Sequence, residues 1–148
     1  MLPLRRLNRF FATFFGVGNI KLAPGTVAAL GAAFAYLLFP VLSHPMVVAT
    51  VFVGGIISCE LEGRRTGIKD DSSLVIDEIA GMWFTFTYLR NPSFILVVLG
   101  FFLFRLFDIW KPAFIKSSQK LPGGTGVMID DILAAVPSNL ILRFIMTI

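Results

Sequence analysis

Acidic residues stand in adjacent pairs at the borders of apolar stretches of this sequence. Asp77 and Glu78 begin the stretch DEIAGMW, Asp130 and Asp131 begin DDILAA, and Asp108 follows the apolar run LF. These five residues are more than half of the nine acids in the chain. One acid in the first turn of a helix is explained by capping and by the helix dipole, which contribute about 0.3 to 1 kcal/mol. Pairs need another explanation.

Adjacent helical residues point about 100° apart, so one member of each acidic pair is expected to face the protein interior or lipid. A carboxylate held at membrane depth costs about 2.5 to 3.5 kcal/mol, which exceeds the gain from capping. We therefore interpret the paired acids as functional candidates.

Carboxylates that converge from separate segments repel one another unless a cation lies between them. Oxygen ligands favour Mg²⁺, Mn²⁺ or Ca²⁺ over zinc, and the single histidine and single cysteine, His44 and Cys59, are expected at opposite membrane faces. Mg²⁺ commonly binds carboxylates together with substrate phosphate oxygens. Basic residues lie on both sides of Asp108 and before the last acidic pair, which indicates a phosphate-bearing substrate or attraction to anionic lipid. They are Arg105, Lys111, Lys116 and Lys120.

Two metal-independent phosphatase chemistries fit the residues poorly. Cys59 and Arg65 have the C-x5-R spacing of cysteine phosphatases, but the five residues between them include two acids, Glu60 and Glu62, where phosphate-binding amides are needed. A histidine-nucleophile lipid phosphatase needs more than one histidine.

The elements that position these acids are expected to be helices in lipid. The chain has 148 residues, 56% of them hydrophobic, and a mean hydropathy of +0.82, far above ordinary soluble proteins. The 38 residues from Leu22 to Cys59 carry no Asp, Glu, Lys or Arg, whereas one span needs about 20. Pro40 and Pro45 interrupt this run and predict a helical hairpin.

Backbone hydrogen bonding in lipid favours helices, so the predicted fold class is an all-α integral membrane bundle. It would contain four to five short apolar helices in one membrane-embedded domain spanning residues 1–148. Five apolar segments carry this prediction: residues 26–41, 46–59, 76–89, 93–107 and 129–147.

The N-terminal segment is basic, with Arg5, Arg6 and Arg9. It lacks a small-x-small cleavage site before the long apolar run, so we expect an amphipathic helix on the membrane surface and no cleaved signal peptide. Eleven of the thirteen Lys and Arg residues fall in three stretches: the N-terminal stretch through Lys21, residues 62–73 and residues 105–120. The positive-inside rule places these stretches and the acids on the cytoplasmic side.

Two glycine-bearing stretches precede the first and the last long apolar segments: GVGNIKLAPGT and LPGGTGVMIDD. Glycines permit close backbone approach and amide arrangements that bind anions, but turns and helix caps explain them equally well.

Four blocks, GVGNIKLAPGT, DSSLVIDEIAGMW, FRLFDIWKP and GGTGVMIDD, together resemble the phosphatidylglycerophosphatase A family of membrane lipid phosphatases. The resemblance covers essentially the whole chain. It implies an Mg²⁺-dependent hydrolase that converts phosphatidylglycerophosphate to phosphatidylglycerol and phosphate in phospholipid biosynthesis. It also implies a multi-pass protein of the bacterial cytoplasmic (inner) membrane with its site on the cytoplasmic face. After the PGT motif the family usually has Gly and Ser, where this chain has Ala28 and Ala29, so no serine there is essential.

The resemblance carries roles to matching positions. The catalytic candidates are Asp77, Glu78, Asp108, Asp130 and Asp131. The metal candidates are Asp77, Glu78, Asp130 and Asp131. The phosphate-binding candidates are Arg105 and Lys111, with Asn19, Gly25 and Thr26 in a second tier. Glu60 and Glu62 are also second-tier candidates, and the sequence does not indicate their role.

Several alternatives stay open at the level of sequence. The nucleophile is water or an aspartate, and the substrate is phosphatidylglycerophosphate, another phospholipid or a polyprenyl phosphate. A non-enzymatic membrane protein that conducts ions or protons would instead need acids distributed through membrane depth. Nucleic-acid binding is not expected despite a pI of 9.6, because the basic residues coincide with membrane-flanking loops.

Overall fold

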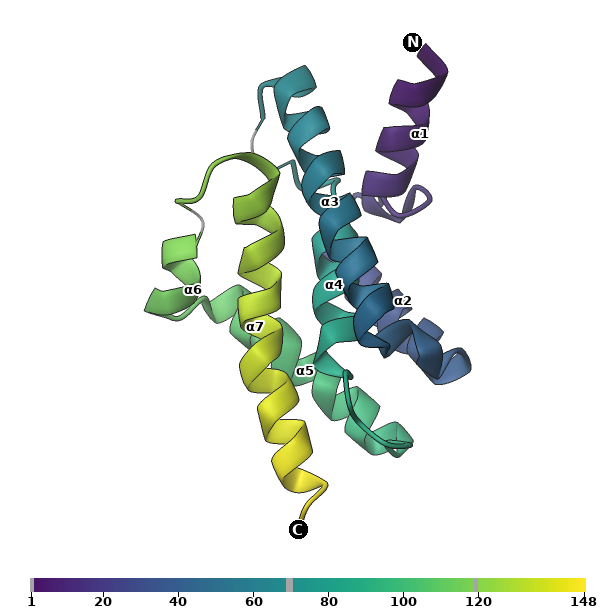
Figure 1. Cartoon of the computed structure of the whole chain (residues 1–148), viewed down its shortest axis with the longest axis vertical. Helices are drawn as coiled ribbons and strands as arrows, with labels where there is room; N and C mark the ends of the chain where they lie inside the picture. Colours follow the sequence, from purple (N-terminus) through teal and green to yellow (C-terminus); the bar gives the residue numbers. More distant parts are fainter. Residues whose placement is uncertain (1, 69–70, 119) are drawn as a thin grey trace.

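The computed structural model describes residues 2–68, 71–118 and 120–148, and in this part of the chain the regular structure is entirely helical (Figure 1). The α-helices have these bounds: α1 Leu2–Ala12, α2 Pro24–Leu38, α3 Pro45–Thr66, α4 Ile76–Thr85, α5 Phe94–Trp110, α6 Ala113–Ser118 and α7 Gly123–Ile145. Two short 3₁₀ helices, η1 at Val17–Asn19 and η2 at Pro40–Ser43, lie in the connections on either side of α2.

Local sequence accounts for several helix ends. Pro24 and Pro45 occupy the first turns of α2 and α3, where the missing amide hydrogen costs nothing. The Ser93 side chain accepts a hydrogen bond from the Leu96 amide at the start of α5. Gly67 ends α3 in the left-handed conformation that glycine adopts without steric cost.

Helix α4 lies at the centre of the bundle and packs against α2, α3, α5 and α7 (Figure 1). Its buried side chains include Ile79 and Met82, and the Phe86 ring that follows it stacks on Tyr36 of α2 at a centroid distance of 4.5 Å. The Asn139 side chain of α7 donates hydrogen bonds to the Thr85 and Thr87 carbonyls, at 2.9 and 2.8 Å. These bonds satisfy the carbonyl end of α4 inside the protein.

Two helices, α3 and α7, are long and apolar enough to cross a membrane by length and composition. Large apolar side chains on the outside of the bundle point away from the core, including Phe34, Phe102 and Leu140. Both observations are consistent with a membrane protein. The number of apolar helices that cross the membrane and the position of α1 on its surface stay predictions.

The structure corrects the predicted elements in two places. The break at Pro40 and Pro45 is confirmed, but α4 packs between α2 and α3, so they do not form a simple hairpin. The last helix begins at Gly123, six residues before the predicted start at residue 129. Asp130 and Asp131 therefore lie beyond the first turn of α7, where capping does not explain them.

Candidate active site

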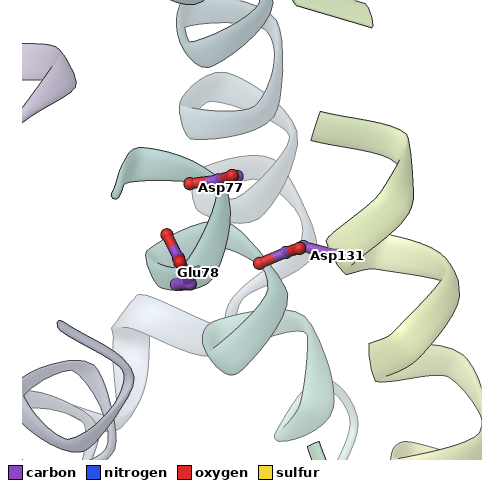
Figure 2. A group of neighbouring side chains, drawn as sticks. All are labelled: Asp77, Glu78 and Asp131. Carbon is purple, nitrogen blue, oxygen red and sulfur yellow. The ribbon is translucent and has the colours of Figure 1, made fainter. Parts of the chain in front are cut away.

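Three carboxylates from two helices converge at the N-terminal end of α4 (Figure 2). Asp77 and Glu78 occupy the first turn of α4, and Asp131 reaches toward them from α7. Each of the three offers one oxygen atom, and these atoms all lie within 4.8 Å of one another. The sequence predicted this convergence of acids from separate segments.

These carboxylates have buried oxygens without a protein partner. Asp77 Oδ1, Glu78 Oε2 and Asp131 Oδ2 are buried and accept no hydrogen bond within the described part of the chain. Buried charges without partners are costly, and they are normally paired or coordinated to metal. The donor set is all oxygen, so the site fits a hard divalent cation such as Mg²⁺.

Burial and mutual repulsion both disfavour the ionised forms of these carboxylates. A bound cation would reverse these effects, because it stabilises the ionised carboxylates.

Two ion pairs lie beside the three carboxylates. Arg105 pairs with Asp108 on α5, and Lys111, at the end of α5, pairs with Asp130 on α7. Lys111 Nζ also lies 3.9 Å from Asp108 Oδ1. Desolvation lowers the pKa of Lys111, but its hydrogen bond to Asp130 and the surrounding acids outweigh this effect and raise it. The lysine therefore stays protonated at neutral pH.

All five predicted acids and both predicted bases line one cavity of about 540 Å³. Asp130, a predicted metal ligand, faces Lys111 and lies outside the three-carboxylate group of Asp77, Glu78 and Asp131. The cavity thus has a carboxylate wall from α4 and α7 and a cationic wall at the end of α5.

The second-tier residues divide between the cavity and the surface. Gly25 lines the cavity, and a Cβ atom there would overlap the Glu78 carboxylate. Thr26 Oγ1 accepts a hydrogen bond from Arg105 Nη2 at 3.2 Å. Asn19 is exposed on η1 and is not among the residues that line this cavity. The nearby Gly18 allows η1 to approach the Ser73 carbonyl in the loop before α4.

Glu60 and Glu62 bind neighbouring elements outside the cavity. Glu60 Oε2 accepts a hydrogen bond from the Gly124 amide at 2.9 Å, at the start of α7. The buried Glu62 accepts hydrogen bonds from Asn8 of α1 at 3.0 Å and from Arg65 at 2.7 Å. These acids connect α3 to the helices on either side of it. Of the outer bases, Lys120 is exposed, and the Lys116 side chain lies outside the described residues.

Seven residues that line the cavity were not among the predicted site residues: Ala23, Pro24, Ser72, Leu74, Ile109, Gly126 and Val127. Ser72 precedes α4, Ile109 lies near the end of α5, and Gly126 lies in the first turn of α7. All seven lie in the four sequence blocks that carry the family resemblance, and this is the signal that could have found them.

Comparisons with known proteins find a family and relatives that match over most of the chain. The sequence profile of a family described as "Phosphatidylglycerophosphatase A" (PgpA) matches residues 10–146. A protein of Escherichia coli (strain K12) with the same name is 37% identical over 138 residues, covering 90% of this chain and 80% of the relative. A Haemophilus influenzae protein of that name is 33% identical over 144 residues, covering 90% and 88%.

A third relative has a name with a different lipid substrate. This Bacteroides thetaiotaomicron protein, provisionally named a phosphatidylinositol-3-phosphatase, is 34% identical over 141 residues, covering 88% of this chain and 87% of the relative. No solved structure matches the chain.

Proposed function

Because the chain belongs to the phosphatidylglycerophosphatase A family, we propose that it hydrolyses the terminal phosphomonoester of phosphatidylglycerophosphate. The products are phosphatidylglycerol and inorganic phosphate. One observation carries the proposal: the cavity combines three converging carboxylates with buried, unpartnered oxygens and the two cations Lys111 and Arg105. The carboxylates can hold a divalent cation that neutralises phosphate charge, and the two cations can bind phosphate oxygens.

Asp77, Glu78 and Asp131 would hold Mg²⁺. When bound, Mg²⁺ would neutralise negative charge on the phosphate and favour its attack by a nucleophile. Asp130 remains a candidate ligand if its pair with Lys111 opens.

The remaining roles belong to the side chains of the cavity. Lys111 and Arg105 would bind the phosphate oxygens and stabilise the charge that they carry in the transition state. Glu78 or Asp131 would accept a proton from the attacking water. Direct attack by an aspartate, with a phosphoenzyme intermediate, stays the alternative that radiolabelled substrate would reveal.

We also propose that the chain is a multi-pass protein of the bacterial cytoplasmic membrane with its cavity at the cytoplasmic face. The basic N-terminal segment, the C-terminal end of α3 and the N-terminal end of α7 lie at one end of the molecule (Figure 1). The positive-inside rule assigns that end to the cytoplasm. Helix α1 would lie on the membrane surface, since Leu4 and Leu7 expose apolar surface beside Arg5 and Arg6.

Another phospholipid monoester is the second candidate substrate. The Bacteroides thetaiotaomicron relative is named for a different phospholipid, and it matches this chain over 87% of its own length. Its name therefore favours this second substrate. The carboxylates and cations of the cavity would act on any phosphomonoester, so the lipid headgroup has to be identified by comparing turnover.

The test is phosphate release by the purified protein in detergent with Mg²⁺ or with EDTA. We expect metal-dependent release from phosphatidylglycerophosphate, and Asp77→Asn and Asp131→Asn should each lower kcat on the order of 100-fold or more. Asp71→Asn is the matched control, since Asp71 lies outside the cavity and Asn can still accept the hydrogen bonds from Ser73. Activity that is indifferent to EDTA and to both cavity variants would contradict the proposed site. Faster turnover of a phosphoinositide would favour the second substrate.

A further inference from the structure

A second large hollow, the α2–α5 groove, runs between those two helices on the outside of the bundle. It has a volume of about 640 Å³, and every residue that lines it is apolar or glycine. The groove is defined by these principal side chains: Val27, Leu30 and Phe34 of α2 with Val98, Phe101 and Phe102 of α5. Leu30, Phe34 and Phe102 are 56%, 62% and 63% exposed, so the groove is open along its length.

The groove begins one helical turn from residues that line the active-site cavity. Thr26 and Arg105 line the cavity, and the hydrogen bond between them joins the same two helices, α2 and α5. On α5, Phe101 of the groove lies four positions before Arg105 of the cavity. On α2, Leu30 of the groove lies four positions after Thr26 of the cavity. Residues four positions apart share a helix face. The hydrogen-bonded pair thus separates a charged cavity from an apolar groove.

The groove has the length of one membrane leaflet. Its residues on α2 extend to Leu37, eleven positions beyond Thr26, which is about 16 Å along a helix. Half of the hydrocarbon core of a bilayer is about 15 Å. A lipid with its phosphate beside Arg105 would therefore keep its chain beside apolar side chains as far as the bilayer centre.

We propose that the α2–α5 groove binds one acyl chain of the phospholipid substrate while the headgroup phosphate lies in the cavity. This inference rests on the proposed function and adds to it the part of the protein that recognises the lipid chain. A smaller apolar pocket of about 240 Å³ is lined by Phe52, Tyr88 and Ile132 among others. Of the two, only the groove lies between the helices that the hydrogen bond at the cavity joins. The groove is therefore the better site for a chain attached to a bound phosphate.

Gly31 provides a variant that fills the groove without disturbing the bundle. It lines the groove, and a Cβ atom built there meets nothing within 4 Å. Gly31→Phe therefore adds a ring in open space, and phenylalanine favours helix more than glycine does. The matched control is Val53→Phe, which adds a ring at a 55% exposed position of α3 away from the groove.

The experiment compares two substrates in the same detergent: dipalmitoyl phosphatidylglycerophosphate and its acyl-free glycerol analogue, which carries the same phosphomonoester. We expect Gly31→Phe to raise KM for the dipalmitoyl lipid by about 10-fold or more and to leave turnover of the acyl-free analogue unchanged. Val53→Phe should change neither. Equal KM values for the wild type and Gly31→Phe with the dipalmitoyl lipid would overturn the proposal.

A photocrosslinking measurement separates this proposal from the proposed function, because it does not depend on turnover. Phosphatidylglycerophosphate with a diazirine in one acyl chain should label α2 and α5, and the unlabelled lipid should compete while phosphatidylcholine should not. Labelling that phosphatidylcholine suppresses equally would show bulk lipid in the groove and would overturn the inference. Wild-type protein that hydrolyses neither substrate would contradict the proposed function, and the labelling pattern would still decide whether the groove selects this lipid.

Discussion

At the scale of single residues, the sequence identified the acids of the site but not their grouping. Asp77, Glu78 and Asp131 converge, while Asp108 and Asp130 pair with the two bases. The two acidic pairs look alike in the sequence. Which acid faces the carboxylate group depends on where α7 begins and on how it packs on α4, and neither can be read from the sequence. The capping alternative could not be rejected from sequence for the same reason.

Gly25 gives a sharp prediction at this scale, because it borders the carboxylate group without belonging to it. In Gly25→Ala the added Cβ would overlap the Glu78 carboxylate, which can swing aside at small cost to the fold. We expect kcat to fall by about 100-fold, since displacement of a catalytic group by an ångström has an effect of this size. Steady-state kinetics and a thermal unfolding curve in detergent are the measurements.

Gly63→Ala is the control for Gly25→Ala, because a Cβ at Gly63 of α3 meets only the Ile68 carbonyl at 3.5 Å, and Gly63 lines neither the cavity nor the α2–α5 groove. It should retain wild-type kcat and be no less stable, since alanine favours helix more than glycine does. Wild-type kcat in Gly25→Ala would show that the position of the Glu78 carboxylate does not limit the reaction.

At the scale of elements, the prolines and the apolar segments predicted where most of the apolar helices lie. The predicted start of α7 was wrong. The residues GGTG have the composition of a turn, yet they form the first turn of α7. The Gly124 amide is satisfied by Glu60, 64 positions earlier in the chain, and Gly124 packs closely against the α3 backbone. Contacts between distant segments override the local preference of GGTG for a turn, and such contacts cannot be predicted from the local sequence.

Glu62 is the residue that we expect to hold α1 on α3. Glu62→Ala removes the acceptor for Asn8 and Arg65 and leaves Arg9, 3.5 Å away, without this partner. Because Glu62 is buried while the arginines are partly exposed, we expect a loss of about 1 to 3 kcal/mol in the free energy of unfolding. Thermal or denaturant unfolding in detergent measures the loss.

Arg64→Ala serves as the comparison for Glu62→Ala. Arg64 forms a salt bridge with Glu60 one turn away, but its side chain is 77% exposed, and such pairs contribute about 0 to 1 kcal/mol. Equal unfolding curves for the two variants would mean that the Glu62 interactions do not stabilise the packing of α1 on α3.

At the scale of the whole molecule, composition predicted an all-α protein with apolar outer surfaces, and the structure agrees. The α2–α5 groove could not be predicted, because its walls come from segments about 70 residues apart and its composition resembles that of any apolar helix pair. Charge distribution was the sequence signal for orientation in the membrane. Arg90 and Arg143 lie outside the three basic stretches that are assigned to the cytoplasm.

Cysteine labelling in intact cells tests this orientation. The native Cys59 is buried, so it should not react with a membrane-impermeant maleimide. A cysteine at Arg90→Cys should be labelled in intact cells, whereas Lys120→Cys should be labelled only after the cytoplasmic membrane is opened. The reverse pattern would place the cavity on the outer face.

The ion pairs in the cavity have a consequence for the end of the catalytic cycle. Lys111 and Arg105 already have carboxylate partners. A phosphate that enters the cavity has to displace Asp130 and Asp108 from these cations or share the cations with them. A lipid substrate would offset this competition through its apolar chain, but free orthophosphate has no chain. Asp108 and Asp130 would therefore compete with inorganic phosphate for the two cations and favour release of this product. Accumulated phosphate would inhibit the enzyme only weakly.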